Sequence, residues 1–138
     1  MTVSYDNPPA LGEPLGKYSH VSSAGGLVFV AGQVGILADG TLAGPELAAQ
    51  MRQVFANIGA ALDDRGAGFG SVMKFTTYLT DASLIAPFYE TREELFAQLY
   101  PDGGYPPNTL LVIDRLVRPE YLLEIEAIAH VGEPQTAG

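Results

Sequence analysis

Two glutamates and a histidine alternate with aliphatic residues near the C-terminal end of the chain. In an extended strand, Glu124, Glu126 and His130 share one face, and the two carboxylates lie about 7 Å apart. That spacing suits acid–base chemistry on a bound molecule. The simpler interpretation is that one glutamate pairs with a cation such as Arg115 and the other is solvated. The pattern leaves both interpretations open and favours one catalytic or water-holding glutamate over two.

The carboxylates lie on a predicted strand, Leu122–Val131, which follows a second predicted strand, Thr109–Ile113. Both runs are rich in β-branched and aliphatic residues and are bounded by proline or charged residues. The face opposite the glutamates is fully apolar: Leu123, Ile125, Ala127, Ala129 and Val131. The face of Glu124 and Glu126 also carries Leu and Ile, so we expect it to line a partly buried site or a subunit contact.

The rest of the chain predicts a β-β-β-α-β-α-β-β order within one domain, residues 1–138. The expected elements are an edge strand over 1–6, strands Tyr18–Ser23 and Leu27–Val34, a helix Pro45–Arg65, a strand Val72–Leu79, and a helix from the Asp81 cap to about Tyr100. Two helices can cover only one face of such a mixed sheet. This predicts an α+β fold and a homo-oligomer with sites at its interfaces.

Within Leu27–Val34, strict alternation predicts two faces. Val28, Val30 and Val34 are expected on one face with Gly32, and the other face carries Leu27, Phe29, Ala31 and Gln33.

Composition excludes several classes of function. Seven scattered basic residues face sixteen acidic ones, with a net charge of −9, so we expect no nucleic-acid partner. No apolar run approaches the roughly 20 residues of a membrane span, and the N-terminus does not resemble a signal peptide. We therefore expect a cytoplasmic protein without a membrane partner. Cysteine is absent, and His20 and His130 are far apart, which disfavours a metal site.

Five short segments resemble the RidA family (YjgF/YER057c/UK114) in order and spacing. They are Gly16–Ser19, Val30–Val34, Ala49–Gln53, Tyr105–Thr109 and Ile125–Ala129, and the similarity runs from about Tyr18 to His130. The resemblance implies a chorismate-mutase-like (bacillary type) two-layer α+β fold, with a mixed six-stranded sheet and two helices on one face. It also implies a homotrimeric barrel with three clefts between subunits.

The resemblance further implies a cofactor-independent hydrolysis of reactive enamines and imines, such as 2-aminoacrylate, to keto acids and ammonia. By motif, Glu124 would place the water and Tyr18 would lie near the substrate. The substrate-binding positions would be Ala31, Gly32, Tyr89, Asn108 and Leu110. Several of these depart from the family pattern, in which a serine is common at 31, a cysteine or other small residue at 110, and a proline at the position of Lys17.

The most consequential departure is Asn108, which stands where the family's carboxylate-holding arginine is expected. An amide offers neither the charge nor the fork of donors of a guanidinium. Losing such a pair costs about 2–5 kcal/mol, and about 1.4 kcal/mol is a factor of ten. We expect a poor 2-aminoacrylate deaminase. Lys17 and Arg115 are candidate replacement cations, but strand alternation points both away from the cleft.

Three functions remain compatible with the sequence. The first is a hydrolase or deaminase acting on a small imine, enamine or amide-like metabolite without an essential carboxylate. The second is a non-enzymatic trimer that binds a small ligand. The third, a ribonuclease or translation inhibitor, is disfavoured by the acidic balance. The first is the preferred interpretation.

Overall fold

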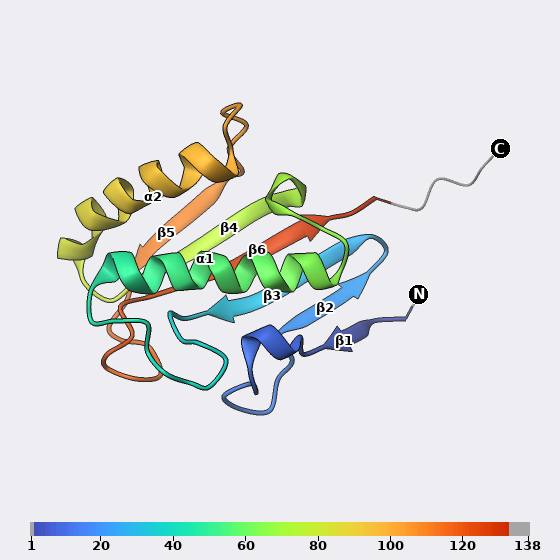
Figure 1. The fold of residues 1–138 in the computed structure, drawn as a ribbon, viewed down its shortest axis with the longest axis horizontal. Coiled ribbons are helices and arrows are strands. Elements are labelled where there is room, and N and C mark those ends of the chain that lie inside the picture. The colour runs from blue at the N-terminus through green and yellow to red at the C-terminus, as the bar shows by residue number, and fades with distance from the viewer. Residues whose placement is uncertain (1, 133–138) are drawn as a thin grey trace.

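A single six-stranded sheet organises residues 2–132, the part of the chain that the computed structural model describes. The strand order is β1-β2-β3-β6-β4-β5 (Figure 1). All neighbours are antiparallel except β4 and β5, which are parallel, so the sheet is mixed, as predicted. The strands are β1 Ser4–Asp6, β2 Val21–Ala24, β3 Leu27–Gln33, β4 Val72–Leu79, β5 Asn108–Val112 and β6 Leu123–His130.

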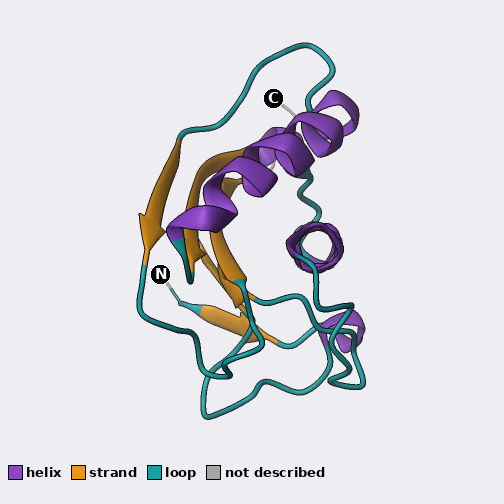
Figure 2. Cartoon of the chain, turned by 90° about the vertical axis from the view of Figure 1, so that its left-hand side faces the viewer, coloured by secondary structure: helices purple, strands orange, loops and turns teal. Residues whose placement is uncertain are grey.

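Two helices, α1 Leu47–Asp64 and α2 Ile85–Leu99, cover one face of the sheet (Figure 2). The predicted helices are therefore confirmed, with ends that differ by one to a few residues. Asp81 caps the second helical segment as expected, because its side chain accepts a hydrogen bond from the Ser83 N–H at 2.8 Å. The first turn there is a 3-10 helix, Ala82–Leu84, which delays the start of α2.

The core lies between these helices and the inward face of the sheet. From α1, an apolar stripe at helical spacing is fully buried: Met51, Val54, Ile58 and Leu62. From β6, the buried residues are Leu123, Ile125, Ala127 and Ala129. Val131 does not continue this face: it follows the end of β6 and is 42% exposed.

A β-bulge in β3 makes the predicted face of Gln33 wrong. Val30 pairs with Ala127 of β6 and Gln33 pairs with Ile125, so three steps along β3 oppose two steps along β6. The extra residue turns Gln33 to the helix side, where it is 4% exposed. Its amide donates hydrogen bonds to Ala31 O and to His20 Nδ1, both at 3.2 Å.

His20 is a structural residue held by this arrangement. Its Nδ1 accepts from Gln33, and its Nε2 donates to Gly12 O at 3.1 Å. His20 is buried, whereas His130 is exposed at the end of β6. The two histidines therefore do not form a common site.

The predicted strand Tyr18–Ser23 begins three residues too early. Residues 17–20 form bends, and β2 starts only at Val21. The Tyr18 hydroxyl accepts a hydrogen bond from the Leu15 N–H at 3.2 Å, which closes a small loop before the strand. Strand alternation therefore does not apply at Lys17 and Tyr18.

A buried glutamine of α1 fastens the segment that leads into β6. Gln50 is fully buried, and its Nε2 donates to Gly44 O and Glu120 O, both at 3.0 Å. Its Oε1 accepts from the Leu122 N–H at 2.9 Å. All of these polar groups are thus paired at the point where the chain enters β6, two residues before Glu124.

We predict that Gln50→Leu destabilises the protein by about 2–4 kcal/mol, because each buried group left without its partner costs about 1–3 kcal/mol. Urea unfolding followed by circular dichroism measures this loss. Gln98→Leu, at an exposed position of α2, is the matched control and should change the unfolding free energy by less than about 0.5 kcal/mol. Equal effects of the two variants would contradict the assigned role of Gln50.

Candidate active site

The predicted site residues lie on opposite faces of the same sheet. Asn108 of β5 pairs with Phe75 of β4, whose side chain is buried on the helix side. Glu124 of β6 pairs with Tyr78, three residues further along β4 and therefore on the other face. Within one chain the sheet separates Asn108 from Glu124, so the two side chains cannot meet on a common ligand.

On the face not covered by helices, Glu124 lines a cavity of about 690 Å³, hereafter the glutamate cavity. The structure brings together here four of the predicted site residues, Tyr18, Ala31, Gly32 and Glu124, from the loop before β2, from β3 and from β6. Arg115 also lines this cavity, with Leu15, Gly16, Ser19, Val34, Leu116 and Val117. The structure therefore places these four predicted residues around one cavity.

Glu124 is held in conditions that favour its protonated form. Burial raises the pKa of its carboxyl group above the ordinary value, and the charge of Glu126 raises this pKa further. No side chain within residues 2–132 donates a hydrogen bond to it. A carboxylate with a raised pKa and unused acceptor positions is suited to take a proton from water.

Glu126 has a different environment. It accepts a hydrogen bond from the Tyr78 hydroxyl at 2.7 Å, and this bond raises the pKa of Tyr78. Arg115 does not pair with either glutamate: its Nε and Nη2 donate to Leu116 O and Val117 O at 2.9 and 3.0 Å. The alternative in which one glutamate pairs with Arg115 is therefore not observed, and Glu126 instead accepts a hydrogen bond from Tyr78.

Gly32 leaves the space that the Glu124 side chain occupies. A Cβ added at this position would lie 2.5 Å from Glu124 Oε1 and 2.6 Å from its carboxyl carbon. The bulge of β3 falls at Ala31 and Gly32, so the same irregularity turns Gln33 inward and brings bare backbone against the carboxyl group. Any side chain at residue 32 would displace Glu124.

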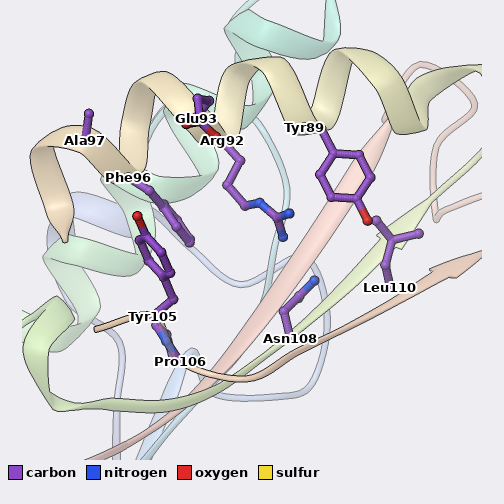
Figure 3. A pocket seen from close by; sticks show the side chains of 9 residues that line it. All are labelled: Tyr89, Arg92, Glu93, Phe96, Ala97, Tyr105, Pro106, Asn108 and Leu110. Atoms are coloured by element: carbon purple, nitrogen blue, oxygen red, sulfur yellow. The ribbon is translucent and has the colours of Figure 1, made fainter. Parts of the chain in front are cut away.

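A second cavity, of about 600 Å³, lies between α2 and β5 (Figure 3); it is hereafter the helix–strand cavity. It contains the remaining predicted site residues, Tyr89, Asn108 and Leu110, with Arg92, Glu93, Phe96, Ala97, Tyr105 and Pro106. Asn108 Oδ1 accepts a hydrogen bond from the Thr77 hydroxyl at 2.8 Å. The predicted site residues thus divide between two cavities of one chain.

Arg92 is a cation of this cavity that sequence reasoning missed. Its guanidinium carbon lies 4.6 Å from the ring centroid of Tyr89 and 5.2 Å from that of Phe88. Tyr89 and Arg92 are three residues apart on α2, a spacing that places both on one helix face. That spacing could have been read from the sequence once Tyr89 was assigned to the site. Lys17 lines neither cavity.

Two further properties hold for the described residues. Residues 2–132 contain no group of three or more His, Cys, Asp or Glu side chains placed to hold a metal ion. Neither helix in this range is long and apolar enough to cross a membrane.

Fold and cavities together define a class of protein: a small two-layer α+β chain with a glutamate-bearing cavity on its open sheet face and a second cavity between α2 and β5. The family model described as "Endoribonuclease L-PSP" matches residues 9–131. The chain belongs to this family, which is the RidA (YjgF) family, and its fold is the chorismate-mutase-like α+β fold.

Three similar proteins illustrate the relationship. A RutC family protein of Pyrococcus abyssi is 33% identical over 119 residues, which cover 86% of this chain and 89% of that protein. A 2-iminobutanoate/2-iminopropanoate deaminase of Salmonella typhimurium is 27% identical over 93% of this chain and 95% of its own. The structure of E. coli TdcF with bound serine superposes with a TM-score of 0.80 at 27% identity, covering 91% of this chain and 96% of that one.

We predict that Glu126→Gln lowers the pKa of Glu124, because it removes a negative charge that raises this pKa and keeps an acceptor for Tyr78. The pKa should stay above the ordinary glutamate value, since burial is the larger cause. Carboxyl ¹³C chemical shifts followed over a pH titration measure it. Glu120→Gln, at an exposed position, is the control and should leave the titration unchanged. An increase with Glu126→Gln would contradict the assigned electrostatics.

Proposed function

We propose that the protein hydrolyses the C=N bond of a small imine, formed directly or from an enamine, in a cleft between two subunits. The observation that carries this proposal is the environment of Glu124, a half-buried carboxyl group of raised pKa beside Tyr18 in a cavity large enough for a metabolite and water. The Salmonella relative, named as a 2-iminobutanoate/2-iminopropanoate deaminase, supports the same reaction class.

The reaction needs a water activated against an electrophilic carbon. The Glu124 carboxylate takes a proton from water as the water oxygen bonds to the imine carbon. The C=N electron pair moves to nitrogen, and protonated Glu124 gives its proton to that nitrogen. In the resulting carbinolamine, Glu124 takes the hydroxyl proton and passes it to the amino group, so that the C–N bond breaks, ammonia leaves and the carbonyl forms. Imine and water give carbonyl compound and ammonia, so no cofactor takes part. The Tyr18 oxygen accepts a hydrogen bond from the Leu15 N–H, so the Tyr18 O–H group remains able to donate one.

Two chains are needed to complete the site. The glutamate cavity and the helix–strand cavity lie on opposite sides of one sheet, so a ligand touching both must lie between the open face of one chain and the β5 edge of another. The open face exposes apolar side chains, with Phe29 45% and Leu111 40% exposed, which favours burial against a neighbour. We propose that the assembly is a homotrimer.

The alternative function is a non-enzymatic trimer that binds a small ligand. Asn108 favours it, because the amide lacks the charge of an arginine, and the TdcF structure with bound serine shows a relative holding a small molecule. Glu124→Gln separates the two functions. Loss of turnover with retained ligand binding supports the hydrolase, whereas a wild type that binds without any turnover supports the alternative.

The first prediction of this proposal concerns assembly. The protein should sediment as a particle of about three times its 14.6 kDa chain mass. Phe29→Asp places a charge on the open face and should shift the equilibrium toward monomers, because an unpaired charge is costly to bury. Ala56→Asp, on the exposed side of α1, should leave the assembly intact. A wild type that stays monomeric at micromolar concentration would refute the two-chain site.

The second prediction concerns the reaction. On 2-iminopropionate generated in situ, we expect Asn108→Arg to raise kcat/KM, because a guanidinium group adds a charge and a fork of donors that the amide lacks. Asn108→Arg/Glu124→Gln should lose this gain, since the hydrolytic group is removed. A wild type as fast as family members with arginine at this position would show that Asn108 carries no penalty.

A further inference from the structure

Arg92 and Asn108 enter the helix–strand cavity from opposite walls. Arg92 extends from α2 and Asn108 from the start of β5, and the guanidinium group points toward the Asn108 amide (Figure 3). The two residues also line the small adjoining cavity between Phe75, Phe88 and Phe96. A cation and an amide therefore face one another across space that a ligand can occupy.

The donors of both side chains are directed at this space. Asn108 Oδ1 is engaged by the Thr77 hydroxyl at 2.8 Å, so the Nδ2 end, which carries two hydrogens, faces Arg92 (Figure 3). Two donor groups that face each other cannot bond to one another. An acceptor placed between them can bond to both.

Aromatic contacts hold the Arg92 guanidinium group in place, and no ion pair formed within residues 2–132 neutralises its charge. The ion pairs formed within residues 2–132 involve Arg52 and Arg65. Arg92 instead lies over the rings of Tyr89, Phe88 and Phe96, at 4.6, 5.2 and 6.0 Å from their centroids. Stacking covers the flat face of a guanidinium group and leaves its N–H edge for an anion.

One acidic residue also lines the cavity. Glu93 is exposed and adjacent to Arg92 in sequence, and neighbouring residues on a helix point in different directions. Glu93 therefore lies at the rim, whereas Arg92 and Asn108 face the interior. An anion that reaches the interior meets a guanidinium group and an amide.

We propose that Arg92 and Asn108 form the anion-binding end of the cleft, so that the imine substrate carries a carboxylate. This inference rests on the proposed hydrolysis and names its substrate class. The cation is supplied by the helix instead of by the strand, and Asn108 acts as the second donor. A guanidinium edge and an amide N–H₂ group together offer a carboxylate two or three hydrogen bonds.

The test compares two imines that differ in charge. Wild type, Arg92→Met and Arg92→Lys are assayed on 2-iminopropionate and on propan-2-imine, which lacks the carboxylate. Arg92→Met should lower the preference for 2-iminopropionate by about thirty- to four-thousand-fold in kcat/KM. Arg92→Lys should recover only part of it, because an ammonium group lacks the fork of donors. The loss in Arg92→Met should be larger on 2-iminopropionate than on propan-2-imine.

A double variant tests whether the cation must lie on α2 or can be moved to β5. Arg92→Met/Asn108→Arg moves the cation from α2 to β5 and should restore activity on 2-iminopropionate. The matched control is Arg52→Met, which removes an arginine that pairs with Glu94 at the surface and should leave the preference unchanged. Denaturation midpoints of all variants show whether Arg92→Met only loosens the aromatic contacts. An unchanged preference in a folded Arg92→Met variant overturns the inference.

Binding measurements separate this inference from the proposed function. Calorimetry with pyruvate and with pyruvamide, a neutral analogue, needs no turnover. If the wild type binds pyruvate but hydrolyses neither imine, and Arg92→Met no longer binds pyruvate, the proposed hydrolase is refuted and the anion site is retained. Hydrolysis of both imines with equal rates in wild type and Arg92→Met would retain the hydrolase and refute the anion site.

Discussion

The two faces of a β-strand impose the constraint on which the structure depends. Because side chains alternate across a sheet, β6 directs Leu123, Ile125 and Ala127 against α1 and α2 while Glu124 and Glu126 point the other way. Two helices cover only one face. The face that bears the carboxylates is then left with exposed apolar neighbours, Phe29 and Leu111, and the cation and amide of the helix–strand cavity lie on its far side. A fold built this way can unite them only by combining chains.

The regular parts of this arrangement were predictable from the sequence. The apolar stripe of α1 and the alternating residues of β6 are long and uninterrupted, so their periods determine both the element and its buried face. The hydrophobic pattern does not reveal where a strand gains a residue. The bulge at Ala31 and Gly32 shifted the phase of alternation, and Gln33 therefore lies on the face opposite to its predicted one.

The candidate site was only partly predictable, for a related reason. The motifs indicate Tyr18, Gly32 and Glu124, and the structure brings these three residues to one cavity. Lys17 and Arg115, the cations that the sequence offers in place of the expected arginine, are neighbours of motif residues along the chain. Arg92 reaches Asn108 across the gap between a helix and a strand, and no local spacing in the sequence links residues 92 and 108. The helical spacing from Tyr89 was the available signal.

The two glutamates of β6 differ because the tertiary structure treats them differently. Glu126 accepts a hydrogen bond from the Tyr78 hydroxyl, whereas Glu124 is half-buried against Gly32 without a donor within residues 2–132. The negative charge of Glu126, two residues away on the same face, adds to burial in raising the pKa of Glu124. Strand alternation alone predicts equivalent environments for the two carboxyl groups. The hydrogen bond from β4 makes their environments different, and such differences are how neighbouring carboxyl groups come to hold different roles.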